Sequence, residues 1–91
     1  MSILTEADAL VNGERQQQYG HPLDQYTKLA GLVNAQFAEK LLVKFSAEDM
    51  AVFMVLLKVS RGVDIRDTLV DGAGYFGVIE LIQQEREKRA K

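Results

Sequence analysis

Eight consecutive apolar residues, Met50–Leu57, form the most demanding segment of this chain. Before them, Ser46 with Asp49 three residues later has the pattern of a helix N-cap, and Gly62 after them is suited to end a helix. We therefore predict a helix between Ser46 and Gly62 that is apolar on every side. Neighbours must cover such a helix all round. Three other short helices achieve this with difficulty, so the segment favours a partner subunit.

The rest of the chain also has the spacing of helices. Apolar residues recur at i, i+3 and i+4, and alternating β-branched runs are absent. We predict three further helices, over residues 5–19, over residues 23–41, and from near Asp64 or Asp67 to about Arg89. The expected fold class is all-α, with one domain over residues 1–91. It is a four-helix unit that forms a dimer or larger oligomer, and its charged end, about 83–91, is solvated.

The first predicted helix has clear boundary residues. Thr5 with Asp8 is a variant of the capping box, in which an aspartate replaces the usual glutamate. Gly13, after an asparagine, is a weak point at which the helix can break. Gly20 can take the left-handed conformation and Pro22 cannot continue a helix, so the helix ends before them.

Length and composition exclude several classes of protein. Ninety-one residues without cysteine give one small domain with no disulfides and no thiolate metal site, and oligomerisation is the usual remedy for its thin stability. A net charge of -2 argues against binding bulk nucleic acid or an anionic membrane surface. The apolar segment is too short to span a bilayer, and no secretion signal is visible. We expect a cytoplasmic protein of a bacterium, or of something that replicates in one.

Asp67, Asp71 and Tyr75 follow one another at intervals of four, which places them on one face of the last predicted helix. Two carboxylates one turn apart can hold Mg²⁺ through direct and water contacts, so Asp67 and Asp71 are candidate metal ligands. The alternative for Asp67 is a favourable position at a helix N-terminus. For Asp71 the alternatives are a ligand-orienting group or the partner of a buried base.

Two further observations bear on that face. Glu48 and Asp49 are more carboxylates, but acids in a first turn are favoured by the helix dipole, and only antiparallel packing would bring them to Asp67 and Asp71. Each glycine inside a helix costs about 1 kcal/mol relative to alanine, which indicates close packing or a ligand. The glycines concerned are Gly72, Gly74 and Gly77.

Lys58 and Arg61 are three residues apart and close the apolar helix. As a functional pair they would clamp a phosphate, because arginine offers a bidentate fork and lysine a point charge. As structural residues they would complement the helix dipole or pair with Asp67 and Asp71.

A third candidate site lies around Tyr19 and His21, the one histidine of the chain. Arg15 lies one helical turn before Tyr19, so it could reach a phosphate while Tyr19 stacks on a base. The alternative is an ordinary helix end, with Tyr19 packing and His21 as a last-turn cation. Phosphate loops, dinucleotide fingerprints and nucleophile elbows are absent from the sequence.

Taken together, three motifs resemble a family of small uncharacterised domains of bacteriophages and prophages, notably of actinobacteria. The motifs are Glu14-Arg15-x-x-x-Tyr19-Gly20-His21-Pro22, Leu56-Leu57-Lys58-x-x-Arg61 and Asp67-x-Leu69-x-Asp71-x-Ala73-Gly74-Tyr75. The resemblance covers about residues 3–81.

More distantly, the chain is similar to the all-α nucleotide pyrophosphohydrolases of the MazG type. Those helical oligomers hold Mg²⁺ with Glu-x-x-Glu on one helix and Glu-x-x-Asp on a later one. Here Asp67 and Asp71 match only the later helix, with a spacing of four, and the earlier helix has no such acids. The resemblance therefore implies nucleotide binding more than cleavage.

Three functions stay open. The first is binding of a phosphorylated nucleotide between subunits, with Arg15, Lys58 and Arg61 at phosphate, Tyr19 or Tyr75 on the base and Asp71 at a hydroxyl. In a phage such a protein could sequester a nucleotide signal of host defence. The second is a Mg²⁺-dependent pyrophosphohydrolase, and Mg²⁺ is the one cofactor that these residues suggest. The third is a protein-interaction module whose polar residues form an internal network.

Overall fold

The computed structural model describes residues 2–91, and every regular element in that part of the chain is a helix. The elements are α1 (Ile3–Asn12), α2 (Glu14–Tyr19), α3 (Pro22–Gln36), the short 3₁₀ helix η1 (Ala38–Lys40), α4 (Ala47–Arg61) and α5 (Arg66–Arg89). α1 and α2 together occupy the first predicted helix. Within the described residues, the prediction of an all-α domain of four helical segments is therefore confirmed.

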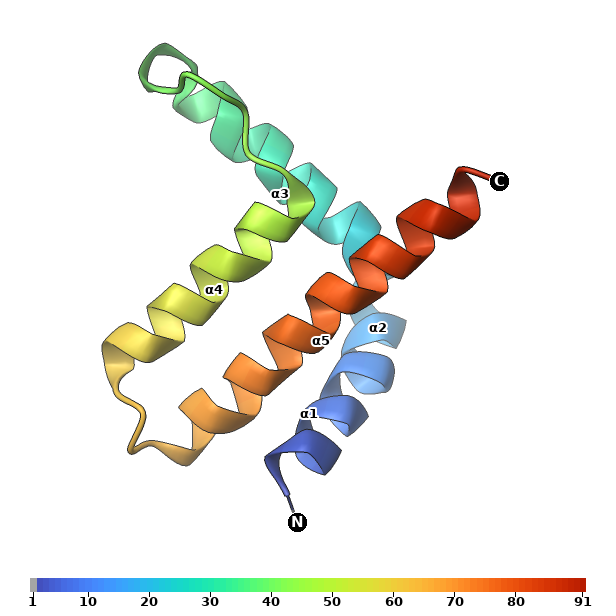
Figure 1. Cartoon of the computed structure of the whole chain (residues 1–91), viewed down its shortest axis with the longest axis vertical. Coiled ribbons are helices and arrows are strands. Elements are labelled where there is room, and N and C mark those ends of the chain that lie inside the picture. Colours follow the sequence, from blue (N-terminus) through green and yellow to red (C-terminus); the bar gives the residue numbers. More distant parts are fainter. Residues whose placement is uncertain (1) are drawn as a thin grey trace.

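α5 is the central element of the fold, because α1, α3 and α4 all contact it. Figure 1 shows α4 on one side of α5 and α1 on the other. α3 begins close to α5 and leads away from it toward η1, from which the chain returns into α4. α4 and α5 are joined by a short connection and run antiparallel, so the end of α4 lies beside the start of α5.

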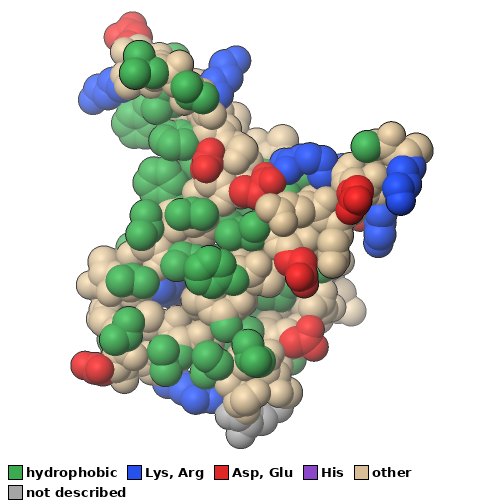
Figure 2. Space-filling view, viewed as in Figure 1, with side chains coloured by type: hydrophobic (Ala, Val, Ile, Leu, Met, Phe, Trp, Pro, Cys, Tyr) green, Lys and Arg blue, Asp and Glu red, His purple; other side chains and the backbone are tan. Residues whose placement is uncertain are grey.

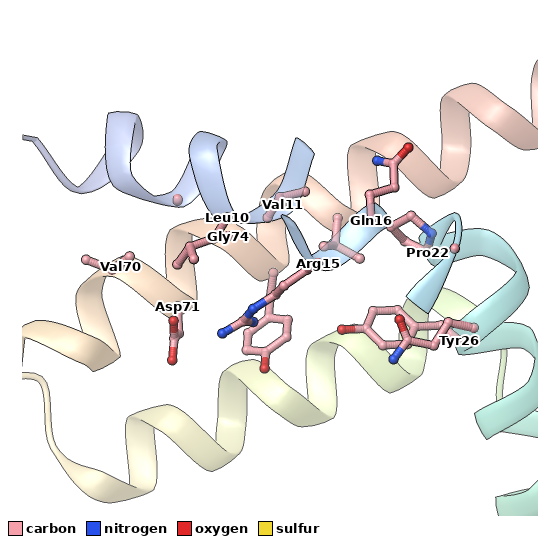
Figure 3. Close-up of a pocket in the computed structure, with 14 residues that line it drawn as sticks. Leu10, Val11, Arg15, Gln16, Pro22, Tyr26, Val70, Asp71 and Gly74 are labelled. Atoms are coloured by element: carbon pink, nitrogen blue, oxygen red, sulfur yellow. The ribbon is translucent and has the colours of Figure 1, made fainter. Parts of the chain in front are cut away.

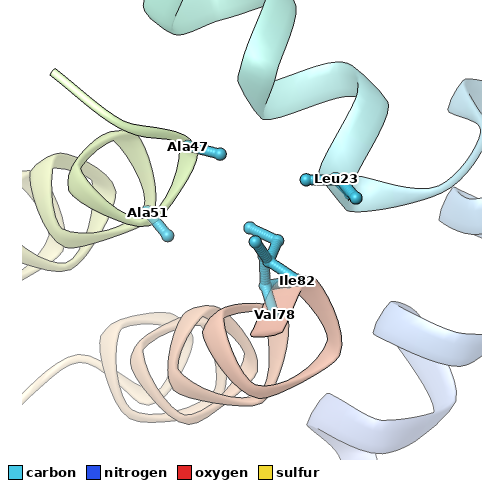
Figure 4. Close-up of a cluster of buried hydrophobic side chains, with 5 residues drawn as sticks. All are labelled: Leu23, Ala47, Ala51, Val78 and Ile82. Carbon is cyan, nitrogen blue, oxygen red and sulfur yellow. The ribbon is translucent and has the colours of Figure 1, made fainter. Parts of the chain in front are cut away.

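The buried core lies where α3, α4 and α5 meet. Ala51 of α4 and Ile82 of α5 are fully buried, and Val78 of α5 and Leu23 of α3 pack with them. Figure 4 shows the small side chains of Ala47 and Ala51 facing the larger ones of α5. Because alanine leaves room, α4 can approach α5 closely enough for Ile82 to fill the space between the helices.

Gly74 marks the close approach of α1 to α5. A Cβ atom at this buried glycine would lie 3.4 Å from Val11 Cγ2 and 3.8 Å from Ala7 Cβ. These are ordinary van der Waals distances, so α1 packs against α5 here, but the contact does not by itself require glycine. At Gly72 and Gly77 a Cβ atom would meet none of the described residues within 4 Å.

The predicted boundaries of α4 are confirmed. The backbone N–H of Asp49 donates to Ser46 Oγ at 3.1 Å, and the backbone N–H of Ser46 donates to Asp49 Oδ2 at 2.8 Å, which completes a capping box. Gly62 ends the helix with φ 111°, in the region that favours glycine.

Other boundaries differ from the prediction. Ser2, not Thr5, caps α1, because its hydroxyl accepts from the backbone N–H of Thr5 at 3.2 Å. The break at Gly13 is present and separates α1 from α2. Pro22 does more than end a helix, since it is the first residue of α3, where a missing N–H costs nothing.

The second predicted helix is too long at its C-terminal end. α3 stops at Gln36, and η1 and an extended segment occupy the next residues. The side-chain amide of Asn34 holds that segment in place: Asn34 Nδ2 donates to Phe45 O at 3.0 Å, and Phe45 N donates to Asn34 Oδ1 at 2.8 Å. These two hydrogen bonds tie the segment after η1 back to α3.

The charged end of α5 is exposed as predicted, but it also makes ion pairs with the rest of the fold. Arg86 pairs with Glu48 at the start of α4. Arg89 binds both carboxylate oxygens of Asp24 in α3, at 2.8 and 3.1 Å, and also Glu85 at 3.0 Å. Hydrogen bonds from these guanidinium groups lower the pKa values of Asp24, Glu85 and Glu48.

α4 is not covered all round by this chain. Met50 and Ala51 face the core, whereas Val52, Phe53 and Leu56 on the opposite side are exposed. Figure 2 shows hydrophobic side chains gathered over this side of the molecule. None of the described helices is both long and apolar enough to cross a membrane.

We expect Ile82→Ala to lower the free energy of unfolding by about 2 to 5 kcal/mol, because it leaves a cavity where α3, α4 and α5 meet. Urea denaturation followed by circular dichroism measures the change. Leu4→Ala is the matched control, since Leu4 is 71% exposed on α1 and should shift stability by less than about 0.5 kcal/mol. Equal effects of the two substitutions would contradict this description of the core.

Candidate ligand-binding site

An ion pair between α4 and α5 defines one edge of the candidate site. Lys58 Nζ lies 2.8 Å from Asp71 Oδ2, and each side chain is only 15% exposed. The hydroxyl of Thr68, one turn before Asp71, is buried and donates to Lys58 O at 3.3 Å. Of the alternatives for Asp71, pairing with a base is the one that the structure contains, and the base is Lys58.

Asp71 also lines a hollow between the N-terminal helices, α3 and α5, which we call the inner hollow. Its cavity volume is about 50 Å³, or about 500 Å³ when the space that is open to solvent is counted. Figure 3 shows the guanidinium of Arg15 and the ring of Tyr26 directed into the same space as the Asp71 carboxylate. Its lining residues are Ala7, Leu10, Val11, Arg15, Gln16, Gly20, Pro22, Gln25, Tyr26, Val70, Asp71, Gly74, Tyr75 and Val78.

A second, outer hollow with a cavity volume of about 420 Å³ adjoins the first. The two hollows share four lining residues, Arg15, Gln25, Tyr26 and Tyr75. Tyr19, Leu29 and Met54 complete the lining of the outer hollow. The structure therefore brings together the first and third sequence motifs, and Lys58 of the second motif reaches them through Asp71.

Local structure explains why Arg15 and Tyr19 lie at the hollows. The break at Gly13 makes α2 a separate short helix, and Arg15 and Tyr19, four residues apart, share one of its faces. Gly20 then turns the chain with φ 82° so that α3 begins at Pro22. Tyr26, one turn into α3, consequently faces the same space from the other side.

Tyr26 has the most perturbed environment in the site. Burial, with a smaller contribution from the neighbouring Tyr75, raises the pKa of its phenol to about 12 against the opposing charge of Arg15. The phenol is thus a neutral hydrogen-bond donor at neutral pH. Three tyrosines, Tyr19, Tyr26 and Tyr75, therefore surround one guanidinium.

The sequence analysis missed Tyr26, Gln16 and Gln25. The one signal for Tyr26 was its place on the apolar stripe of the second predicted helix, three residues before Leu29 and seven before Val33. A tyrosine on such a stripe is normally assigned to the core. Gln16 and Gln25 had no signal of their own, because glutamine is common on exposed helix surfaces.

His21 has a structural position. Its Nδ1 accepts from the backbone N–H of Leu23 at 3.0 Å and so caps α3, which corrects its interpretation as a last-turn cation of the preceding helix. Its Nε2 lies 3.8 Å from the carboxylate of Glu85. The described residues that line the two hollows do not include His21.

Arg61 and Asp67 are exposed and lie outside the lining of both hollows. Asp67 and Asp71 share a face of α5, but Asp71 is already paired with Lys58. Antiparallel packing places Glu48 beside Arg86, at the far end of α4, so within this chain it does not join the two aspartates. Across the part of the chain that the structure describes, no three histidine or acidic side chains form a group that could hold a metal.

The arrangement is suited to a small anionic ligand with a flat ring. Because Lys58 offsets the charge of Asp71, the guanidinium of Arg15 leaves the lining with a net positive charge. Arginine binds phosphate through two parallel hydrogen bonds. The tyrosine rings offer stacking surfaces, and the amides of Gln16 and Gln25 offer both donors and acceptors.

Comparison with known proteins places the chain among sequences without an assigned activity. A family described as "Domain of unknown function (DUF6378)" matches residues 2–88. The Gene 55 protein of Mycobacterium phage L5 is 42% identical over 92 residues, which cover 98% of this chain and 57% of the relative. The Gene 55 protein of Mycobacterium phage D29 is 40% identical over 87 residues, covering 92% and 55%.

The chain thus spans little more than half the length of these two relatives. Both are phage proteins, in agreement with the phage family that the three motifs resemble. No solved structure matches the chain.

We expect Lys58→Met and Asp71→Asn each to lower the free energy of unfolding by about 1 to 3 kcal/mol, because each leaves a largely buried polar partner unpaired. The double variant should cost less than the sum, with a coupling energy of about 0.5 to 3 kcal/mol. Asp67→Asn, one turn away and exposed, is the control and should change stability by less than about 0.5 kcal/mol. Additive effects in denaturant titrations would show that the pair does not form.

We expect the phenol of Tyr26 to ionise near pH 12 rather than near 10. Its raised pKa favours the folded state below pH 10, and this contribution is lost as the pH rises through about 12. Phenolate absorbance of the native protein minus that of Tyr26→Phe isolates this group. A difference curve centred near 10 would contradict the burial of the phenol.

Proposed function

We propose that this chain, which belongs to the DUF6378 family of domains of unknown function, binds a small phosphorylated ligand of the nucleotide type. The observation that carries the proposal is the convergence of three helices on two adjoining hollows. Arg15 and Tyr19 come from α2, Tyr26 from α3, and Asp71 and Tyr75 from α5. The outer hollow, at about 420 Å³, has the size of ordinary ligand pockets, which range from about 300 to 1,000 Å³, and the inner hollow adds a small recess of about 50 Å³ beside it.

Each part of a nucleotide has a matching group in this lining. Arg15 binds the phosphate, because its guanidinium is the unpaired cation among the described lining residues. Tyr19 or Tyr75 stacks on the base, an interaction worth about 1 to 3 kcal/mol per base. Gln25 and the neutral phenol of Tyr26 bind polar edges of the base or sugar. Lys58 acts through Asp71, whose carboxylate it orients, and Arg61 serves phosphate only if the ligand extends beyond the hollows.

Binding without cleavage is the favoured form of this function. Pyrophosphate release of the MazG type uses Mg²⁺ held by several carboxylates. In this chain the candidate Mg²⁺ ligands are Asp67, which is exposed, and Asp71. The carboxylate of Asp71 is already paired with Lys58, so it is less available to a metal ion. The phage origin of the two relatives supports a role in the host cytoplasm, namely sequestering a nucleotide signal of host defence.

A pure interaction module would have the same ion pair without a pocket beside it. Here Asp71 contributes both to the pair with Lys58 and to the lining of the inner hollow. This double role supports ligand binding over a purely internal polar network.

We expect the purified protein to retain an intact nucleotide after incubation with a mixed nucleotide pool that includes cyclic dinucleotides and Mg²⁺. Mass spectrometry of the denatured protein and of the solution reads both fractions. Arg15→Gln should weaken retention about 10- to 100-fold, because it removes a charge-assisted contact worth about 1.5 to 3 kcal/mol. Lys88→Gln, an exposed cation at the far end of α5, is the matched control and should retain nucleotide like the wild type.

Two outcomes would overturn the proposal. Monophosphate and pyrophosphate appearing in solution, and stopping with Asp71→Asn, would establish the hydrolase instead. No retained and no cleaved nucleotide would leave the interaction module as the function.

A further inference from the structure

The outward side of α4 is a continuous apolar surface. Val52, Phe53, Leu56 and Val59 are spaced so that they lie on one side of the helix, opposite the buried residues, and Leu56 at their centre is 58% exposed. No charged side chain interrupts α4 between Asp49 and Lys58. We call these four residues the outer face of α4.

An apolar groove with a cavity volume of about 460 Å³ lies next to this face, between α3 and α4. Lys40 is the one charged residue in its lining, which otherwise consists of Leu29, Val33, Phe37, Leu41, Phe45, Met50, Phe53 and Met54. Phe45 packs edge-on against Phe53 with ring centroids 5.4 Å apart, and the Asn34 amide holds the Phe45 backbone. The groove is therefore preformed by specific contacts.

This exposed surface has the size of a protein interface. Eight large apolar residues of α3, α4 and the residue that follows α3 are 36 to 61% exposed: Leu29, Leu32, Phe37, Val52, Phe53, Leu56, Leu57 and Val59. At about 150 to 250 Å² for a large residue, they expose roughly 750 Å². A standard interface buries about 800 Å² on each partner. Figure 2 shows this hydrophobic surface over α3 and α4.

We infer that a second copy of this chain occupies this surface, with its own outer face of α4 packed antiparallel against the first. A stripe of apolar residues at helical spacing is complementary to itself under a two-fold axis. Because this surface carries almost no charge, it has few groups that could recognise a charged partner. A domain of 91 residues without cysteine has a small core and no disulfides to stabilise it. Dimerisation would bury additional apolar surface and so add to that core.

The dimer closes the ligand site on its open side. Leu29 and Met54 line both the apolar groove and the outer hollow, so the two depressions adjoin. A second copy seated on the groove stands at the rim of the outer hollow, next to Tyr19 and Tyr75. This part of the inference rests on the proposed function, and it makes nucleotide retention depend on dimerisation.

Sedimentation velocity across a dilution series tests the dimer without any ligand. The wild type should sediment at twice the monomer mass of 10.2 kDa, and Leu56→Glu should sediment as a monomer with unchanged helical circular dichroism. Leu4→Glu is the matched control, because Leu4 is also an exposed leucine but lies on α1, and this variant should stay dimeric. A monomeric wild type, or a dimeric Leu56→Glu, would overturn the inference.

Cross-linking keeps the test valid if Leu56→Glu does not fold. The chain has no cysteine, so Leu56→Cys and Leu4→Cys each introduce one thiol. A short bis-maleimide should link Leu56→Cys into a covalent dimer several-fold faster than Leu4→Cys. Equal rates would overturn the inference.

The ligand part is tested with the same mixed nucleotide pool. Monomeric Leu56→Glu should retain at least several-fold less nucleotide than Leu4→Glu. Equal retention by the two would refute the closing of the site by the second copy while leaving the dimer intact. A wild-type dimer that retains no nucleotide would refute the proposed function alone.

Discussion

Close contact of α5 with three neighbouring helices is the constraint on which the rest of the structure depends. Two buried alanines of α4 permit the close contact with α5, because larger residues there would push α4 outward, and Gly74 of α5 lies against α1. With α5 in the middle, its first half presents Asp71 and Tyr75 to the N-terminal helices. Its last turns carry Arg86 and Arg89 to the starts of α4 and α3. The candidate site and the ion pairs of Arg86 and Arg89 thus lie at opposite ends of α5.

The polar residues divide into two groups by their environment. Lys58 and Asp71 are largely buried and satisfy one another, so their first effect is to fix α4 against α5. Arg15 stands in the hollow among tyrosines and glutamines, and it is available for an anion. A buried cation that is already paired can orient a carboxylate, whereas an exposed, unpaired guanidinium is free to accept an anion.

The small size of the domain explains why so much apolar surface remains outside. Five helices of this length enclose one small core, and the apolar residues of α4 exceed what that core can cover. The surplus lies on the side of α4 away from α5 and next to the outer hollow. The surface proposed for self-association and the hollow proposed for ligand binding therefore share an edge, formed by Leu29 and Met54.

The sequence by itself determined the helices and most of their ends, because caps and glycine turns act over three or four residues. Ser46 with Asp49, Gly20 and Gly62 are examples, and the shared face of Asp71 and Tyr75 follows from helical spacing alone. Only the tertiary structure decided that Lys58 pairs with Asp71, that Arg86 forms an ion pair with Glu48, and that Tyr26 lines the hollows. These contacts join helices distant in sequence, and their geometry depends on how closely α5 packs against its neighbours, a distance that local patterns do not encode.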